Sequence, residues 1–289
     1  MKIPCPEIAD SIKKNLTKRV KTLKKKKKTP KLLTILVGES PAQLSFVAIK
    51  QRTAKEMGID FEFLHLKEIP EFLDFANLLK QKSNNKQITG IIIQQPLPPK
   101  LFTETLYNFI NSVKEIEGHQ NKTNYMPPLG LAALTALKYV FLRGKISDKL
   151  IVDGKSDVSF FKNVTKHKRV VLVGRGITGG QPIGKALSYF KINYININSQ
   201  TSDPDQYYKE ADIIITAVGK NVLNVNNIKP GVVLINAGLR REKGKLKGDY
   251  DEDEVKNIAS YYSTTPKGIG PIDVLYLYKN LIDATEKQR

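Results

Sequence analysis

Cysteine is almost absent from this sequence, with Cys5 the one cysteine among 289 residues. A disulfide framework needs pairs of cysteines and a cysteine-based zinc site needs several, so both are excluded, and the composition fits a reducing cytosol. The sequence also lacks an apolar run long enough to span a membrane, and its N-terminus lacks the apolar region of a secretory signal. We therefore expect a soluble cytoplasmic protein with no membrane partner.

Acidic residues are few relative to basic ones. The chain has 47 Lys and Arg against 28 Asp and Glu, which gives a formal charge of +19. Much of the excess lies in KTLKKKKK, residues 21–28. This run is either a patch for a polyanion or a solvated helix end, where lysines complement the helix dipole. No aromatic residues alternate with these lysines as they do on single-strand-binding surfaces, so we predict no nucleic-acid partner.

The first half of the chain alternates between helical and strand-like patterns. Hydrophobic periodicity predicts a helix first and then strands and helices in turn, over residues 7–28, 31–38, 41–57, 59–66, 71–84 and 88–99. The sequence predicts Ser40 as the N-cap of the second helix, with Pro41 at its first position and Gly58 as its stop. Strands that alternate with helices in this way favour a parallel sheet covered by helices.

The same alternation restarts in the second half. A polar stretch at 111–125 and an apolar-striped helix at 129–144 come first, strands and helices then alternate from 167 to 238, and a last helix is predicted over 271–284.

The expected fold class is therefore α/β, with two α/β domains around a cleft and a hinge near 126–145. We expect residues 1–130 plus 271–289 to form one domain and residues 131–270 a Rossmann-type parallel sheet, a division that 289 residues comfortably allow.

A glycine turn marks a candidate nucleotide site. Gly174, Gly176 and Gly179 form G-x-G-x-x-G after a predicted strand and before a helix, a context in which glycines let the backbone approach a pyrophosphate. The alternative is a tight turn without a ligand. An NAD site usually has an acid at the end of the next strand, but here Ser199 lies among polar neighbours without one. With Arg175 in the turn, the sequence favours NADP and leaves NAD possible.

Two further segments could carry chemistry. The loop IIIQQPLPP places Gln94 and Gln95 at the carboxyl end of a predicted strand, where ligands bind in open α/β sheets; the alternative is a polar residue in a turn. On the helix from Pro41, Phe46 and Lys50 are four residues apart and share one face. Lysine on an apolar face either keeps its head in water or, when partly desolvated, acts as a base near neutral pH.

Five motifs in a fixed order resemble one enzyme family. They are the strand-glycine-helix segment with Phe46 and Lys50, and then GIIIQQPLP, VKEIEG, GRGITGGQP and TPKGIGP. From about residue 7 to residue 284 the chain resembles the bifunctional methylenetetrahydrofolate dehydrogenase/methenyltetrahydrofolate cyclohydrolase family of one-carbon metabolism and purine biosynthesis. The resemblance implies that a hydride passes from the folate methylene bridge to NADP, and that the methenyl bridge is then hydrolysed.

The resemblance also implies roles for individual residues. Lys50 matches the family's catalytic lysine and Gln94 the glutamine that holds and tunes it, Phe46 would stack on the pterin, and Glu117 would bind the pterin amino group. Further folate contacts are implied for Pro266, Gly268, Gly270 and Pro271. Cofactor contacts are implied for Gly174, Arg175, Gly176, Gly179, Gly180, Pro182, Ser199 and Gly219. A homodimer is implied as well, and no metal ion.

Departures from the family pattern keep three hypotheses open. Phe46 stands where the family has tyrosine, Glu117 where it has aspartate, and Gly176 where the turn has serine. Lys267 and Asp273 replace a glycine and a threonine, and the segment after KEIEG is shortened. The chain is then a working dehydrogenase/cyclohydrolase with altered folate contacts, a relative with one activity or another pterin, or an inactive binding protein.

Overall fold

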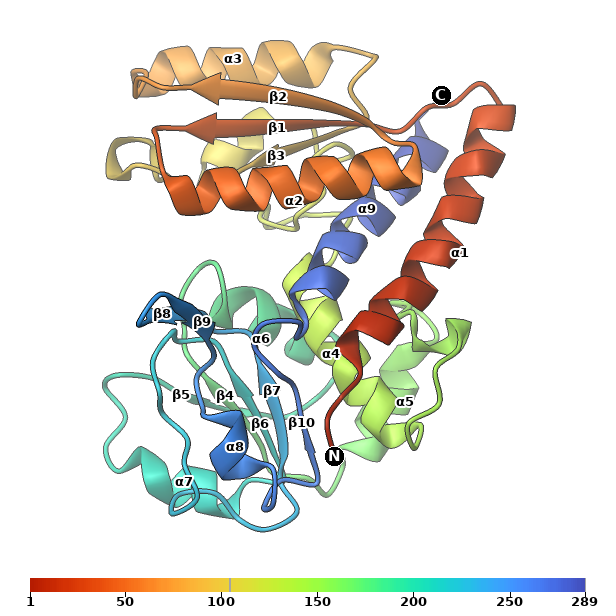
Figure 1. The fold of residues 1–289 in the computed structure, drawn as a ribbon. Coiled ribbons are helices and arrows are strands. Elements are labelled where there is room, and N and C mark those ends of the chain that lie inside the picture. The colour runs from red at the N-terminus through yellow and green to blue at the C-terminus, as the bar shows by residue number, and fades with distance from the viewer. Residues whose placement is uncertain (104, 289) are drawn as a thin grey trace. The chain divides into compact units, whose positions relative to one another are not determined.

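The computed structural model describes residues 1–103 and 105–288, which form two compact units (Figure 1). We call Lys13–Pro127 with Val274–Arg289 the N-terminal unit, and Met1–Ile12 with Pro128–Asp273 the C-terminal unit. Helix α1, Cys5–Lys25, starts in the C-terminal unit and ends in the N-terminal unit, and helix α9, Gly270–Lys287, does the same.

The first residues of the chain belong with the C-terminal unit, whereas the sequence prediction put residues 1–130 together. Lys2 forms a parallel bridge with Tyr262, and the Ile3 backbone N–H donates to the Tyr262 carbonyl at 2.8 Å. This pairing comes from a strand near the other end of the chain, so the local pattern of residues 1–12 could not reveal it.

The N-terminal unit is built on a three-stranded parallel sheet. Its strands follow the order β2-β1-β3, and each pair is parallel. The elements are β1 (Lys31–Val37), α2 (Pro41–Met57), β2 (Asp60–Leu66), α3 (Phe72–Asn84), β3 (Gly90–Ile93), and the short 3-10 helices η1 (Pro99–Leu101) and η2 (Leu106–Phe109). Residues 111–125 hold no helix or strand, as the polar pattern predicts.

Capping fixes both ends of α2. The Ser40 Oγ accepts from the Gln43 backbone N–H at 3.4 Å, Pro41 is the first helical residue, and Gly58 ends the helix in the left-handed region with φ 74°. Glycine reaches this region without the steric penalty of a Cβ. The predicted start and stop of this helix are confirmed, and they fix which side chains share its faces.

Helices pack against both faces of this sheet. Leu33 and Ile35 of β1 pack with Phe75 and Leu79 of α3 in one buried cluster. On β3, a Cβ at Gly90 would lie 2.5 Å from the Leu281 Cδ1 of α9, so glycine there allows close approach of the helix. Both contacts place the end of β3, where Gln94 follows, within a rigid layer.

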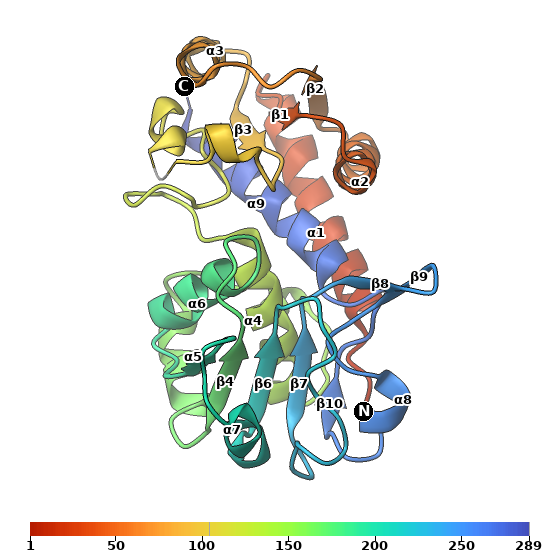
Figure 2. The same cartoon turned by 90° about the vertical axis from the view of Figure 1, so that its left-hand side faces the viewer.

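The C-terminal unit is built on a five-stranded parallel sheet with the order β10-β7-β6-β4-β5. Figure 2 shows β4, β6, β7 and β10 side by side and pointing the same way. Its elements are α4 (Pro128–Phe141), η3 (Asp148–Leu150), α5 (Asp157–Val164), β4 (Val170–Val173), α6 (Gly180–Tyr189), β5 (Ile195–Ile197), α7 (Pro204–Glu210), β6 (Ile213–Thr216), β7 (Val233–Asn236), β8 (Arg240–Glu242), β9 (Lys245–Lys247), α8 (Glu252–Val255) and β10 (Tyr261–Tyr262). The α/β class with a C-terminal parallel sheet is confirmed.

Helix α4 packs closely on α6 in this unit. A Cβ at Gly130 would lie 2.5 Å from the Ala186 Cβ and 2.6 Å from the Pro182 carbonyl oxygen, so only glycine permits the contact. The sequence prediction did not include α5, α8 or the antiparallel hairpin of β8 and β9. These elements are too short for a clear hydrophobic period. Among the described residues, no helix combines the length and apolarity needed to cross a membrane.

Candidate active site

Lys50 and Gln94 meet in the N-terminal unit. The Lys50 Nζ donates a hydrogen bond to the Gln94 Oε1 at 2.7 Å. Lys50 lies on α2 and is half-buried, while Gln94 follows β3 and exposes 8% of its surface. The carboxyl end of a parallel strand thus places a glutamine against a lysine 44 residues away in sequence. The geometry brings together the two residues that the sequence singled out separately.

Further hydrogen bonds fix the orientation of Gln94. Its Nε2 donates to the Gln95 carbonyl oxygen at 3.0 Å, so its Oε1 is the atom that faces Lys50. Gln43, on the buried side of α2, donates through Nε2 to the carbonyl oxygens of Gln94 at 3.3 Å and Pro96 at 2.8 Å. The amide of Gln94 is therefore preorganised as an acceptor for the Lys50 Nζ.

The backbone of Lys50 is held from another helix. The Tyr278 Oη of α9 donates to the Lys50 carbonyl oxygen at 2.6 Å, and the Tyr278 side chain is fully buried. One turn earlier on α2, Phe46 leaves 44% of its surface exposed. An exposed ring beside a held lysine is a surface on which a planar ligand can stack.

Glu117 carries a buried carboxylate oxygen in this unit. Its side chain exposes 20%, but the Oε2 atom itself is buried and has no hydrogen-bond partner among the described residues, with the His119 Nε2 3.8 Å away. Burial raises the pKa of the Glu117 carboxyl, while the Lys50 charge and the Ile93 backbone N–H act in the opposite direction. A buried acceptor without a donor is what a site for a ligand's N–H group presents.

The second group of predicted residues lies at the carboxyl edge of the five-stranded sheet. Gly174 follows β4 with φ 116°, where a Cβ would lie 2.8 Å from the Ala217 carbonyl oxygen. Gly179 precedes α6, and a Cβ at Gly180 would lie 2.2 Å from the Gly174 carbonyl oxygen. Close backbone approach therefore requires glycine at positions 174 and 180, and Pro182 lies in the first turn of α6. Such a turn before a helix N-terminus fits a dinucleotide.

Other predicted cofactor residues surround this turn. Arg175 donates through Nη1 to the Gln200 Oε1 at 3.3 Å, and Ser199 precedes Gln200 after β5. Gly219 follows β6 with φ 67°. A Cβ at Gly176 would meet no atom within 4 Å, so packing does not require glycine there. Gly176 stands where the family has serine, so the turn loses a hydroxyl group although there is space for a serine side chain.

The segment TPKGIGP lies in the C-terminal unit. The Thr265–Pro266 peptide bond is cis, and Lys267 has φ 71°. A Cβ at Gly268 would lie 2.3 Å from the Thr264 carbonyl oxygen. Gly270 and Pro271 begin α9. The structure thus places these predicted folate contacts in a unit other than the one that holds Lys50, Gln94 and Glu117.

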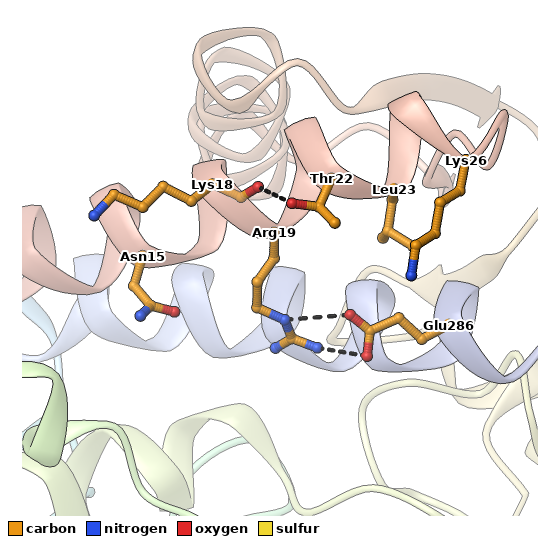
Figure 3. A pocket seen from close by; sticks show the side chains of 7 residues that line it. All are labelled: Asn15, Lys18, Arg19, Thr22, Leu23, Lys26 and Glu286. Atoms are coloured by element: carbon orange, nitrogen blue, oxygen red, sulfur yellow. Dashed lines mark hydrogen bonds and ion pairs between the residues drawn. The ribbon is translucent and has the colours of Figure 1, made fainter.

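Two surface grooves lie away from all of these residues. One, of about 270 Å³, runs between α1 and α9 and is lined by Asn15, Lys18, Arg19, Thr22, Leu23, Lys26 and Glu286 (Figure 3). Arg19 is already paired with Asp283 at 2.6 Å and Glu286 at 2.9 Å, so its charge is neutralised. The other, of about 300 Å³, is lined by residues of α3, of η2 and of the turn after η2: Lys80, Ser83, Asn84, Asn108, Phe109, Ile110 and Asn111. Residues 1–103 and 105–288 bring together no set of three His, Cys, Asp or Glu able to hold a metal ion.

These features define the class of the protein. It is an α/β protein with an N-terminal catalytic-type α/β unit and a C-terminal NAD(P)-binding parallel sheet. A family model for the catalytic domain of tetrahydrofolate dehydrogenase/cyclohydrolase matches residues 3–117, and one for the NAD(P)-binding domain matches residues 158–289. The chain belongs to the tetrahydrofolate dehydrogenase/cyclohydrolase family.

Individual proteins of the same family are similar to this chain over nearly its whole length. The chain is 30% identical to the bifunctional protein FolD of Staphylococcus carnosus, over 98% of this chain and 96% of that protein. The bifunctional FolD structure of Campylobacter jejuni matches with a TM-score of 0.87 at 24% identity, over 100% and 99% of the two chains. A FolD structure of Trypanosoma brucei, complexed with NADP and an inhibitor, matches with a TM-score of 0.78 at 23% identity, over 99% and 97%. Their fold is the fold of this chain.

Sequence reasoning missed several residues that shape the site. Gln43 and Tyr278 hold Gln94 and Lys50, as described above. The Gln95 Nε2 also donates to the Tyr107 Oη at 2.5 Å, and Tyr107 stacks on His119 with ring centroids 4.2 Å apart. A glutamine on the buried face of α2 was the one available signal, because a buried polar side chain needs a partner.

Proposed function

We propose that this protein oxidises methylenetetrahydrofolate to methenyltetrahydrofolate with NADP and hydrolyses the methenyl form to formyltetrahydrofolate. The hydrogen bond of 2.7 Å between the Lys50 Nζ and the Gln94 Oε1 carries the proposal. It supports a lysine fixed at one place beside a stacking ring, with a buried carboxylate in the same unit. An inactive binding protein would have no use for this arrangement.

Each residue has a role in binding or proton handling. Phe46 stacks on the pterin, and the Glu117 carboxylate accepts a hydrogen bond from its amino group. In the hydrolytic step a water oxygen bonds to the cationic methenyl carbon and loses a proton. Lys50 accepts this proton, and the hydrogen bond with Gln94 keeps the lysine in place. One carbon–nitrogen bond then breaks: its nitrogen takes up a proton, the hydroxyl oxygen loses its remaining proton and forms the C=O bond of the formyl group, and the net reaction releases one proton.

The oxidative step needs no acid or base from the protein. NADP supplies the acceptor for the hydride of the methylene bridge. The glycine turn of Gly174, Gly179 and Gly180 fits a pyrophosphate, because each lacks a side chain where the backbone must approach closely. Arg175 and Ser199 would bind the ribose 2′-phosphate. These residues would hold the cofactor for the hydride transfer.

A pair of spectrophotometric assays on the purified protein tests the proposal. One follows NADPH formation from methylenetetrahydrofolate, and the other follows decay of methenyltetrahydrofolate. We expect both reactions above the uncatalysed rate. One reaction alone would assign a single activity, and Phe46 and Glu117 would be the first residues to revert. If neither proceeds, the proposal fails and a folate- or nucleotide-binding role replaces it.

We expect Phe46→Tyr to raise kcat/KM for the hydrolysis about two- to tenfold, because a tyrosine hydroxyl adds one hydrogen bond to a site that keeps its ring. Steady-state kinetics of both assays measure the change. Phe63→Tyr is the matched control, since Phe63 is a similarly exposed phenylalanine of the same unit at 37%. A loss of activity in Phe46→Tyr would show instead that the site has repacked around phenylalanine.

We expect Arg175→Ala to lower kcat/KM for NADP about 10- to 150-fold, the effect of one charge-assisted hydrogen bond to a phosphate. The rate with NAD, which lacks the 2′-phosphate, should hardly change. Initial rates with each cofactor measure the ratio, and Arg241→Ala on the β8–β9 hairpin serves as a control for a lost positive charge. Equal losses with both cofactors would remove Arg175 from 2′-phosphate recognition.

A further inference from the structure

The segment 115–120 carries Glu117 without the support of a helix or strand. Its first residue, Glu115, exposes only 1% of its surface. The Glu115 Oε1 accepts from the backbone N–H groups of Glu117 at 2.9 Å and Gly118 at 3.0 Å, and its Oε2 accepts from those of His119 at 3.0 Å and Gln120 at 3.3 Å. One buried carboxylate thus binds four successive N–H groups of its own segment.

The start of the segment is fixed to the sheet. The Ile91 N–H of β3 donates to the Lys114 carbonyl oxygen at 2.8 Å, and Glu115 forms a parallel bridge with Ile91. The Lys114 Nζ donates to the carbonyl oxygens of Ser83 at 2.6 Å and Asn85 at 2.7 Å, at the end of α3. Glu115 therefore starts from a fixed backbone, and its carboxylate ties residues 117–120 to that fixed point.

Further contacts restrict the backbone of residues 116–120. Gly118 has φ 81°, and a Cβ there would lie 2.7 Å from the Tyr125 carbonyl oxygen. Gln120 donates through Nε2 to the carbonyl oxygens of Tyr107 and Ile110, both at 2.7 Å. The Asn280 Nδ2 of α9 donates to the Ile116 carbonyl oxygen at 2.8 Å. The backbone on each side of Glu117 is therefore held, while its own Oε2 lacks a hydrogen-bond partner among the described residues.

We propose that Glu115 is a positioning residue for folate: its buried carboxylate fixes the backbone of residues 117–120 and so aims the Glu117 carboxylate at the pterin. This inference rests on the proposed function for the identity of the ligand. Glu115 touches no reacting atom and acts through Glu117. In Glu115→Gln an NH2 group replaces one carboxylate oxygen and cannot accept the two backbone hydrogen bonds that this oxygen accepts in the wild type. The segment 117–120 then loses part of its support and relaxes.

The C-terminal unit offers a matched control of the same chemistry. Asp249 is fully buried, its Oδ2 accepts from the Val218 N–H at 2.9 Å, and its Oδ1 accepts from the Lys220 N–H at 3.1 Å. These two N–H groups flank Gly219, a predicted cofactor contact. A Cβ at Gly238 would lie 2.1 Å from the Asp249 Oδ2, so the carboxylate occupies that space. Asp249 holds a cofactor segment as Glu115 holds a folate segment.

The kinetic experiment compares Glu115→Gln, Glu115→Asp and Asp249→Asn with the wild type. We expect Glu115→Gln to raise KM for methylenetetrahydrofolate about 5- to 150-fold, the effect of unpaired buried donors, with KM for NADP unchanged. Asp249→Asn should raise KM for NADP and leave KM for methylenetetrahydrofolate unchanged. Glu115→Asp keeps the charge and should recover part of the folate affinity. Equal rises of both KM values in Glu115→Gln, or an unchanged folate KM, would overturn the proposal.

Amide hydrogen exchange on the same variants needs no substrate. In Glu115→Gln the amides of residues 117–120 should exchange at least about tenfold faster, while those of residues 218 and 220 keep the wild-type rate. Asp249→Asn should show the opposite pattern. Wild-type exchange at 117–120 in Glu115→Gln would refute the positioning role even in an active enzyme. If the wild type turns over neither folate and this pattern is seen, the proposed function fails while Glu115 still positions Glu117.

Discussion

Lys50→Met should lower kcat for methenyltetrahydrofolate hydrolysis by about two to four orders of magnitude, the usual contribution of a positioned proton-transfer group. Methionine keeps the length and apolar stem of lysine but cannot accept or donate the proton. The variant loses the hydrogen bond of 2.7 Å from the Lys50 Nζ to Gln94. The backbone carbonyl of residue 50 still accepts from Tyr278 at 2.6 Å, so the variant should keep the position of α2. Hydride transfer needs no acid or base, and the oxidation should therefore persist.

The measurement is kcat for both reactions, together with the far-ultraviolet circular dichroism spectrum and NADP affinity. Lys55→Met is the matched control, because Lys55 is an exposed lysine in the last turn of the same helix. It should leave both reactions unchanged. Wild-type hydrolysis in Lys50→Met would defeat the assignment of the lysine, and loss of the spectrum would show that the residue is needed for folding instead.

Glu117→Gln should lower kcat/KM for methylenetetrahydrofolate about 10- to 150-fold, because it replaces a hydrogen bond to a charged acceptor by one to a neutral amide. The same variant should gain stability. The Glu117 Oε2 is buried with no hydrogen-bond partner among the described residues, and such a group costs about 1–3 kcal/mol of the free energy of unfolding. The carboxylate thus favours function over stability.

The sign of the pH dependence follows from the direction of the shift. Burial raises the pKa of Glu117 above its ordinary value of 4.5, so the folded protein binds this proton more tightly than the unfolded chain. The resulting stability is fully present below the ordinary pKa and is lost as pH rises through the folded pKa. Glu117→Gln has no such loss, and its advantage over the wild type should therefore grow from acid to neutral pH. In the wild type the folate KM should rise as pH falls through the raised pKa.

Urea unfolding at several pH values, and the folate KM over the same range, measure both effects. Glu62→Gln is a control of opposite sign: hydrogen bonding to Lys31 lowers the pKa of Glu62, although burial opposes this. Its contribution is present at neutral pH and is lost as pH falls, so Glu62→Gln should lose up to about 1 kcal/mol at neutral pH. If Glu117→Gln is less stable than the wild type at neutral pH, the lack of a hydrogen-bond donor at the Glu117 Oε2 does not cost stability.

Local patterns predicted the elements that carry the site. Ser40, Pro41 and Gly58 predicted the ends of α2, because capping and the left-handed stop are decided within a few residues. The run GIII predicted β3 and hence the place of Gln94 at its carboxyl end. The glycine turn before α6 was also predicted from a few residues, because only glycine permits the close approach of the backbone at Gly174 and Gly180.

Contacts between distant residues could not be predicted in this way. Tyr278 is 228 residues from Lys50, and Asp249 is 31 residues from Val218. Glu115 is nearer to its partners, but a glutamate in a polar stretch gives no sign that its carboxylate is buried. Whether Lys2 belongs with β10 or with α1 likewise depends on a strand about 260 residues later.

The sequence by itself determined the α/β class, the order of strands and helices, and the residue types available for stacking, proton handling and phosphate binding. The physical reason is that periodicity, capping and glycine conformation are local properties. The pairing of Lys50 with Gln94 was implied by the family resemblance and not by any local pattern, and the tertiary structure gives its geometry. Only the tertiary structure decided that the Glu117 Oε2 is left without a hydrogen-bond partner among the described residues, and that Glu115 and Asp249 hold the segments around them. Burial and pairing depend on which elements pack together, and one position's neighbours in sequence do not fix its neighbours in space.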